Sequence, residues 1–369
     1  MKILIACDKF KDSLSAVKVC NALAEGLKNN PAINIVICPM ADGGDGSLET
    51  LNHYLNLKPI KLTVNDPLFR PIKSTYYSFK KVAYIEMASA SGLVLLKKQE
   101  RDCMITTSFG TGQLIADAVK KGATTINLFI GGSATNDGGI GIAAALGYRF
   151  YDASGNILLP IGKNLSLINH IDNREVFFNV KEVLIRVVCD VNNPFHGNNG
   201  AAYIYASQKG AGPSEIAQLN QGLINLSSKL IEHGFPDIAD ISGSGAAGGV
   251  GGGAMAFLGA QLVSGVQNFT EITQLDSLIQ DCDLVITGEG KLDAQTQHGK
   301  VISGVCHLAK QHNKSVIAVC GDAEIAISKK LGLQKVYTIS DRANCFEDSI
   351  EKAEEYLVAI GITISNTIK

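Results

Sequence analysis

The sequence predicts an α/β protein in which the two ends of the chain together form a doubly wound, five-stranded parallel sheet. Apolar runs without polar alternation occur at residues 2–7, 33–39, 283–288, 315–321 and 335–340. Helical patterns separate these runs, and buried strands that alternate with helices are typical of a parallel sheet covered on both faces. The chain has 369 residues, more than one hydrophobic core usually includes, so two domains are expected.

The terminal segments contain the helical patterns that such a sheet requires. After the first strand, positions 16, 17, 20, 23, 24 and 27 are apolar at helical spacing. A short helix is expected from about Ser47, and residues 299–312 are helical in pattern. We therefore assign residues 1–60 and 284–369 to one α/β domain.

The middle of the chain has a different pattern and predicts a second, inserted α/β domain at residues 61–283. Residues 60–79 alternate around Pro67 and Pro71, as in an antiparallel hairpin. Residues 214–233 form an amphipathic helix with an apolar side, and three further apolar runs predict strands at 82–88, 125–132 and 183–191.

Composition excludes several classes of protein. The net charge is −2 and the chain has no basic block, so nucleic acid is not an expected partner. The nine cysteines form no C-x-x-C pair, which indicates a reducing compartment. Residues 242–266 carry no charge, but nine of them are glycine, so a buried loop and helix is expected there instead of a membrane span. We expect a cytoplasmic protein.

Acidic residues follow every strand of the predicted terminal sheet. The carboxyl ends of parallel strands lie at one edge, where ligands bind in open sheets. Asp322 and Asp341 are expected to cap the next helix. Crowded like charges are costly unless a cation joins them, and oxygen ligands suit Mg²⁺. A functional role is therefore predicted for a set of four acids: Asp42, Asp45, Glu289 and Asp293.

Three glycine-rich loops in the middle domain predict anion binding. They span residues 131–147, 189–211 and 242–260. Glycines expose backbone N–H groups, and a helix N-terminus favours anions. Lys9 and Lys291 lie on the glycine-rich edge of the other domain, where a lysine is expected to contact a phosphate or carboxylate.

Other catalytic signatures are absent or lack their context. A G-x-G-x-x-G pattern begins at Gly243, but no clear strand precedes it and no acid follows at the required distance, which disfavours an NAD-dependent oxidoreductase. The sequence has no Walker loop, protein-kinase signature or G-x-S-x-G elbow. Anion-binding loops, carboxylates and a few lysines together favour metal-assisted phosphoryl transfer to a small anionic acceptor.

Six motifs resemble those of the bacterial glycerate kinases of the first type. They lie in order along nearly the whole chain, at residues 8–16, 39–50, 131–141, 189–211, 243–253 and 287–301. The resemblance implies ATP-dependent phosphorylation of D-glycerate with Mg²⁺, usually giving 2-phosphoglycerate, although 3-phosphoglycerate is possible. It also implies a flavodoxin-like domain interrupted by one that resembles the restriction-endonuclease fold. Remaining alternatives are a kinase of another hydroxy or sugar acid and a non-catalytic ligand-binding regulator.

Residue roles follow as hypotheses. Asp190 or Asp42 is the candidate base on the glycerate hydroxyl, and Lys9 or Arg70 the partner of its carboxylate. Further expected substrate contacts are Ser133, Asn136, Asp137 and Asn192. Nucleotide phosphates are expected at Gly131, Gly132, Gly245, Gly248, Gly249, Gly251 and Lys291, and Mg²⁺ at Asp45, Glu289 and Asp293. A monomer or homodimer without membrane or nucleic-acid partners is expected.

Overall fold

The computed structural model describes residues 1–44, 46–177, 182–293, 296 and 300–368. The chain divides into two compact units. Unit 1 comprises Met1–Leu55 and Ser264–Lys369, and unit 2 comprises Asn56–Val263.

The units divide at positions that differ from the expected boundaries after residues 60 and 283. The first strand of unit 2 already begins at Lys58, because it pairs along its length with the next strand. Helices α9 (Gly265–Thr273) and α10 (Leu275–Gln280) contact α11 (Val301–Gln311), so both belong to unit 1.

Unit 1 is built on a five-stranded parallel sheet, as predicted. Its strand order is β13-β12-β11-β1-β2, and every neighbouring pair is parallel. The strands are β1 (Lys2–Cys7), β2 (Asn34–Ile37), β11 (Leu284–Leu292), β12 (Ser315–Ala323) and β13 (Lys335–Thr338).

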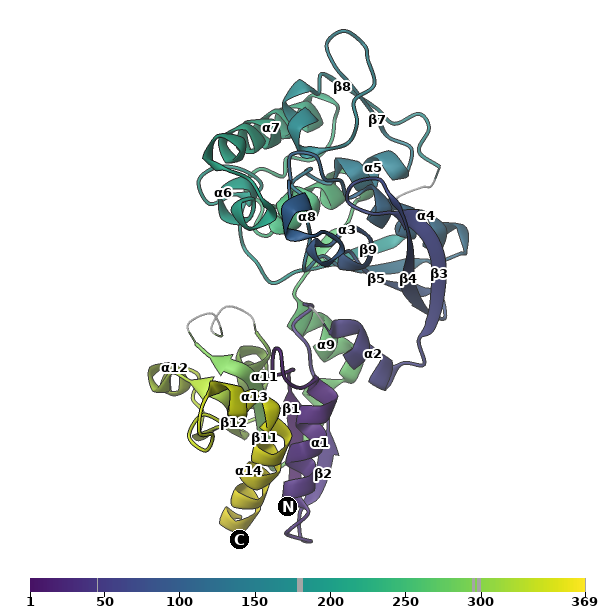
Figure 1. Cartoon of the computed structure of the whole chain (residues 1–369). Coiled ribbons are helices and arrows are strands. Elements are labelled where there is room, and N and C mark those ends of the chain that lie inside the picture. Colours follow the sequence, from purple (N-terminus) through teal and green to yellow (C-terminus); the bar gives the residue numbers. More distant parts are fainter. Residues whose placement is uncertain (45, 178–181, 294–295, 297–299, 369) are drawn as a thin grey trace. The chain divides into compact units, whose positions relative to one another are not determined.

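Helices pack on this sheet. Ile3 and Ile5 of β1 lie in one buried cluster with Leu23 of α1 (Ala16–Leu27) and Ile360 of α14 (Ala353–Thr367). Figure 1 shows α1 and α14 side by side along the sheet. Helix α11, whose residues lie outside that cluster, contacts β1, β11 and β12. The remaining helices are α2 (Ser47–Tyr54), α12 (Ile325–Lys330) and α13 (Phe346–Glu351).

Unit 2 contains a six-stranded mixed sheet of order β10-β9-β6-β5-β4-β3. The predicted antiparallel hairpin is confirmed as β3 and β4, and the three apolar runs form β5, β6 and β9. Strands β5, β6, β9 and β10 are parallel to one another. The bounds are β3 (Lys58–Asn65), β4 (Pro71–Phe79), β5 (Val82–Glu86), β6 (Thr125–Phe129), β9 (Leu184–Val188) and β10 (Gln261–Val263). A separate antiparallel pair is formed by β7 (Arg149–Tyr151) and β8 (His170–Asp172).

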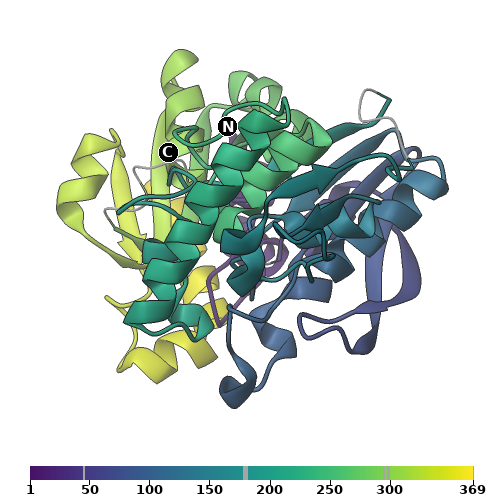
Figure 2. The same ribbon diagram turned by 90° about the horizontal axis from the view of Figure 1, so that it is seen from above.

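The helices of unit 2 surround one large core. The predicted amphipathic helix is α7 (Pro213–Glu232), a long unbroken helix drawn in teal-green in Figure 2, and its leucines 219, 223, 226 and 230 are buried. The others are α3 (Ala88–Ser91), α4 (Phe109–Lys120), α5 (Ile140–Ala145), α6 (Ala201–Tyr205) and α8 (Ala246–Leu258). Within the described residues, no helix has the length and apolar character needed to cross a bilayer.

Candidate active site

Three carboxylates gather at the carboxyl edge of the sheet in unit 1. Asp8 follows β1, and its backbone N–H donates to Gly288 O of β11 at 2.8 Å. Asp42 follows β2, and Glu289 lies in β11. Burial, followed by the charge of Asp42, raises the pKa of Asp8 well above its usual range, and Glu289 adds to this effect. These acids therefore lie close enough to repel one another, as the parallel strands predicted.

Glu289 is buried, and its pKa is raised to about 7, chiefly by burial. The hydroxyl of Thr296 donates to its Oε1, while Asp293 and Asp42 raise the pKa further. A carboxyl group with this pKa populates both the protonated and the ionised form at neutral pH. A cation beside it would favour the ionised form.

Strand β11 continues to Leu292, beyond residue 288, where the predicted strand ends. Glu289 pairs with Cys320 and Lys291 with Asp322 of β12. The glycines explain this extension, because a Cβ on Gly288 would lie 2.1 Å from Val319 O. Glycine here allows neighbouring strands to approach each other closely. From the sequence alone, this role cannot be distinguished from that of a glycine in a turn.

Asp42 is held by its own loop. Its Oδ1 accepts a hydrogen bond from Gly44 N at 2.9 Å. Its carbonyl oxygen packs against Gly265, where a Cβ would lie only 1.8 Å away. Asp45, the neighbouring acid of the predicted metal site, lies outside the described residues.

The donor chemistry of this edge fits a hard divalent cation such as Mg²⁺. Asp8 and Glu289 are buried carboxylates with raised pKa values, so crowding and desolvation penalise their charge. Asp293 lies near Glu289, whose pKa it raises, and its backbone N–H donates to Thr296 Oγ1 at 3.1 Å. Among the described residues, no three His, Cys, Asp or Glu side chains stand in a ready-made metal-binding group.

Lys9 lines a pocket of about 360 Å³ in unit 1, together with Asp8, Gly46 and Glu49. A Cβ on Gly46 would lie 3.5 Å from Lys9 Cδ, so the lysine side chain extends over the start of α2. Lys291 is exposed and lines another pocket of unit 1, of about 570 Å³, with Asp322.

A third pocket, of about 360 Å³, lies at the carboxyl ends of β6 and β9 in unit 2. Gly131, Gly132 and Ser133 from the loop after β6 line it, together with Asp190 from the loop after β9. The structure thus brings together four of the residues that the sequence singled out. We call this the unit 2 pocket.

Lys209 also lines the unit 2 pocket, although no pattern in the sequence predicts a role for it. It is only 2% exposed, and its Nζ donates to Ser133 Oγ and to Thr135 O, each at 2.7 Å. Burial lowers its pKa to about 8. The feature of the sequence that could have pointed to Lys209 is its position inside the motif at residues 189–211.

Asn136 and Asp137 are fully buried and do not line the described pockets. Asp137 accepts hydrogen bonds from Ser108 N and Ser108 Oγ, both at 2.7 Å, and from Gly139 N at 3.1 Å, so it holds the loop together. Burial raises its pKa. The side-chain oxygen and nitrogen of Asn136 have no partner among the described residues.

The glycine-rich loop at residues 242–260 packs against the loops at 131–147 and 189–211. A Cβ on Gly248 would lie 2.1 Å from Thr135 O, and one on Gly245 would lie 2.1 Å from Pro194 O. A Cβ on Gly251 would likewise lie 2.4 Å from Gly243 O, and a Cβ on Gly249 would lie against the side chain of Phe195. These glycines therefore have a packing role, whereas Gly131 and Gly132 are exposed at the pocket.

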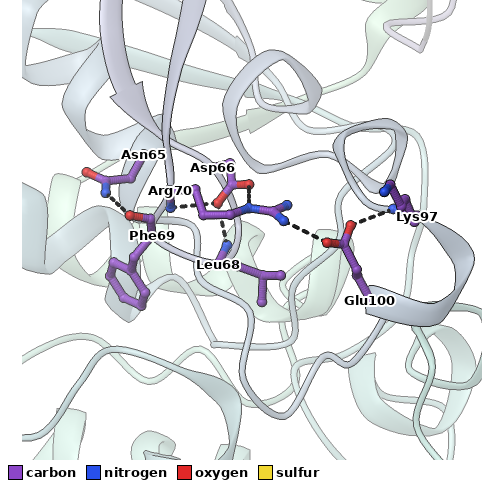
Figure 3. Close-up of polar contacts among 7 residues, drawn as sticks. All are labelled: Asn65, Asp66, Leu68, Phe69, Arg70, Lys97 and Glu100. Carbon is purple, nitrogen blue, oxygen red and sulfur yellow. Dashed lines mark hydrogen bonds and ion pairs between the residues drawn. The ribbon is translucent and has the colours of Figure 1, made fainter.

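Arg70 belongs to an ion-pair network at the end of the β3–β4 hairpin (Figure 3). Its Nε donates to Asp66 Oδ2 at 2.6 Å, and its NH1 donates to Glu100 Oε1 at 2.7 Å. These existing partners argue against a role in binding a substrate carboxylate. Asn192 is exposed and accepts a hydrogen bond from Ser242 Oγ at 3.1 Å, outside the lining of the unit 2 pocket.

Comparisons with known proteins cover nearly the whole chain. The sequence profile described as "Glycerate kinase family" matches residues 3–369. "Glycerate 2-kinase" of Escherichia coli K12 is 39% identical, with 100% of this chain and 98% of the relative covered. "Glycerate kinase" of Bacillus subtilis 168 is 37% identical over 100% of this chain and 98% of the relative. A crystal structure provisionally named glycerate kinase 2, from Salmonella typhimurium LT2, has a TM-score of 0.87 at 38% identity and covers 100% and 98% of the two chains.

Proposed function

Since the chain belongs to the glycerate kinase family, we propose that it transfers a phosphoryl group from ATP to a hydroxyl group of D-glycerate. The observation that carries this proposal is the family match over residues 3–369, together with relatives near 38% identity over their full length. We propose the 2-phosphate as the product, because the relative at 39% identity carries the name glycerate 2-kinase.

The site geometry supports roles for particular residues. Asp190, which lines the unit 2 pocket, and Asp42, which lies at the acidic edge of unit 1, are the two candidate bases for the acceptor hydroxyl. Lys9 contacts an anionic group of one substrate. Gly131 and Gly132 supply backbone N–H groups to a phosphate, and Lys291 offers a second cationic contact.

Glu289 and Asp293, with Asp45, would hold Mg²⁺. When bound, the cation supplies charge neutralisation for the phosphates of ATP. The protein's own part is to position the acidic edge and to keep Glu289 out of bulk water, because a carboxylate charge acts more strongly on a neighbouring ion where water is excluded.

The proposed architecture and setting follow the family resemblance. The strand order of unit 1, in chain order 2-1-3-4-5, supports a flavodoxin-like domain. We propose that unit 2 is an inserted domain resembling the restriction-endonuclease fold. A cytoplasmic location as a monomer or homodimer is proposed as well, and the nine free cysteines support a reducing compartment.

Phosphorus NMR of the product from ATP, Mg²⁺ and D-glycerate tests the proposal. A new monoester resonance matching 2-phosphoglycerate is expected, and the 3-phosphate would give a distinct one. A panel of other hydroxy and sugar acids, with coupled detection of ADP, provides the comparison. Turnover of another acid without turnover of glycerate would overturn the substrate assignment.

A further inference from the structure

Lys209 is a buried cation, and among the residues that the structure describes no carboxylate accepts a hydrogen bond from it. It is 2% exposed, and the described residues give its Nζ two acceptors, Ser133 Oγ and Thr135 O, both of which are neutral. Electrostatic interactions with Cys103 and Asp137 affect the pKa of Lys209 less than burial does. A buried charge of this kind is expensive unless an opposite charge joins it.

An anionic ligand has access to Lys209 through the unit 2 pocket. The lysine ends a short 3₁₀-helix, η4 (Ser207–Lys209), and lines the unit 2 pocket beside Ser133. An ammonium group has three N–H donors, and the two protein acceptors account for two of them. Asp190 is the other charged residue among the described residues that line the pocket.

We propose that Lys209 binds the carboxylate of D-glycerate in the unit 2 pocket, an assignment that rests on the proposed function. One ammonium matches the single negative charge of a carboxylate. A nucleotide with its whole triphosphate inside the pocket would instead bring several negative charges beside Asp190, with a single lysine to compensate them. With its carboxylate on Lys209, glycerate has its hydroxyl groups in the pocket that Asp190 lines.

The first test compares Lys209→Met with Lys98→Met, which removes an exposed lysine of the same unit. Methionine keeps the length of the side chain and removes its charge. A hydrogen bond to a charged group contributes about 2 kcal/mol, so the KM for D-glycerate should rise about 30-fold in Lys209→Met. The KM for ATP should change less than about threefold, and Lys98→Met should match the wild type in both. An unchanged KM for glycerate in a folded Lys209→Met, or an equal rise for both substrates, would overturn the assignment.

The second test uses the wild-type protein and so does not depend on the variant folding. Amines are acetylated with acetic anhydride, with and without D-glycerate or ATP, and each lysine is followed by peptide mass spectrometry. D-Glycerate should slow acetylation of Lys209 and leave Lys98 unchanged. Protection by ATP alone, or no protection by glycerate, would contradict the inference.

Failure of the inference is distinguishable from failure of the proposed function. If the wild type phosphorylates glycerate but Lys209 shows neither effect, glycerate kinase activity stands and the carboxylate binds elsewhere. If the wild type gives no phosphoglycerate at all, the proposed function fails, and the assignment of this carboxylate to Lys209 fails with it.

Discussion

Asp42 and Asp190 belong to different units, and replacing each with alanine tests which of them is the catalytic base. Replacing the base with alanine should lower kcat by at least about 100-fold, the usual contribution of general base catalysis. Coupled detection of ADP measures the rate, and circular dichroism checks the fold. Asp341→Ala, at an exposed acid after β13, is the matched control and should keep wild-type turnover. Turnover within about tenfold of wild type for both Asp42→Ala and Asp190→Ala would rule out both candidate bases.

The raised pKa of Glu289 predicts that the stability of the metal-free protein depends on pH. Its pKa is raised from an ordinary 4.5 to about 7 in the folded state. The folded protein therefore binds more protons than the unfolded chain between these values, and the free energy of unfolding falls as the pH rises through them. The shift corresponds to about 3 kcal/mol as an order of magnitude.

Urea unfolding at about pH 5 and about pH 7.5, in the presence of a chelator, measures this fall. Glu289→Gln should lose most of it, since glutamine does not titrate. Glu347→Gln, at an exposed position, should keep it. A Glu289→Gln variant with the full wild-type dependence would mean that other groups cause the effect.

At the scale of elements, the packing of the glycine-rich loops predicts a contrast between two glycines. Gly132 and Gly248 both have positive φ, 71° and 73°, so alanine meets similar backbone strain at each, about 1–2 kcal/mol. At Gly132 the nearest atom to a new Cβ is Ala88 Cβ at 3.4 Å, whereas at Gly248 it is Thr135 O at 2.1 Å.

Gly248→Ala should therefore lose about 1–3 kcal/mol more of the free energy of unfolding than Gly132→Ala, because overpacking adds to the strain. Chemical denaturation of both variants measures the difference. Equal losses would show that the loops can separate to admit a side chain, which would restore an open, ligand-binding interpretation of Gly248.

The elements were predictable where a periodic pattern governs them. The five strands of unit 1, the β3–β4 hairpin and α7 all follow from apolar spacing. The extension of β11 through Glu289 was not predictable, because its glycines accommodate a neighbouring strand and not a turn. Lys209 was also missed, because nothing in its local sequence shows that the fold buries it. Glycine and lysine both take their roles from neighbours distant in sequence.

At the scale of the whole molecule, each unit has a core of its own. The large cluster that includes Ile85, Leu128 and Leu226 is made only of unit 2 residues, and the cluster around Ile5 and Leu357 only of unit 1 residues. Residues 56–263, expressed alone, should therefore fold and unfold in one cooperative thermal transition, followed by circular dichroism. A fragment without such a transition would show that unit 2 depends on unit 1.

The pairing of β1 has a consequence for the growing polypeptide on the ribosome. Strand β1 lies between β2, which ends at Ile37, and β11, which begins at Leu284. At 5–20 residues per second, the intervening chain of roughly 250 residues takes about 12–50 s to synthesise. During that time the apolar strand at the N-terminus lacks one native neighbour, while unit 2 can already be complete. Strand β1 thus gains its second neighbour only after the whole of unit 2 has been made.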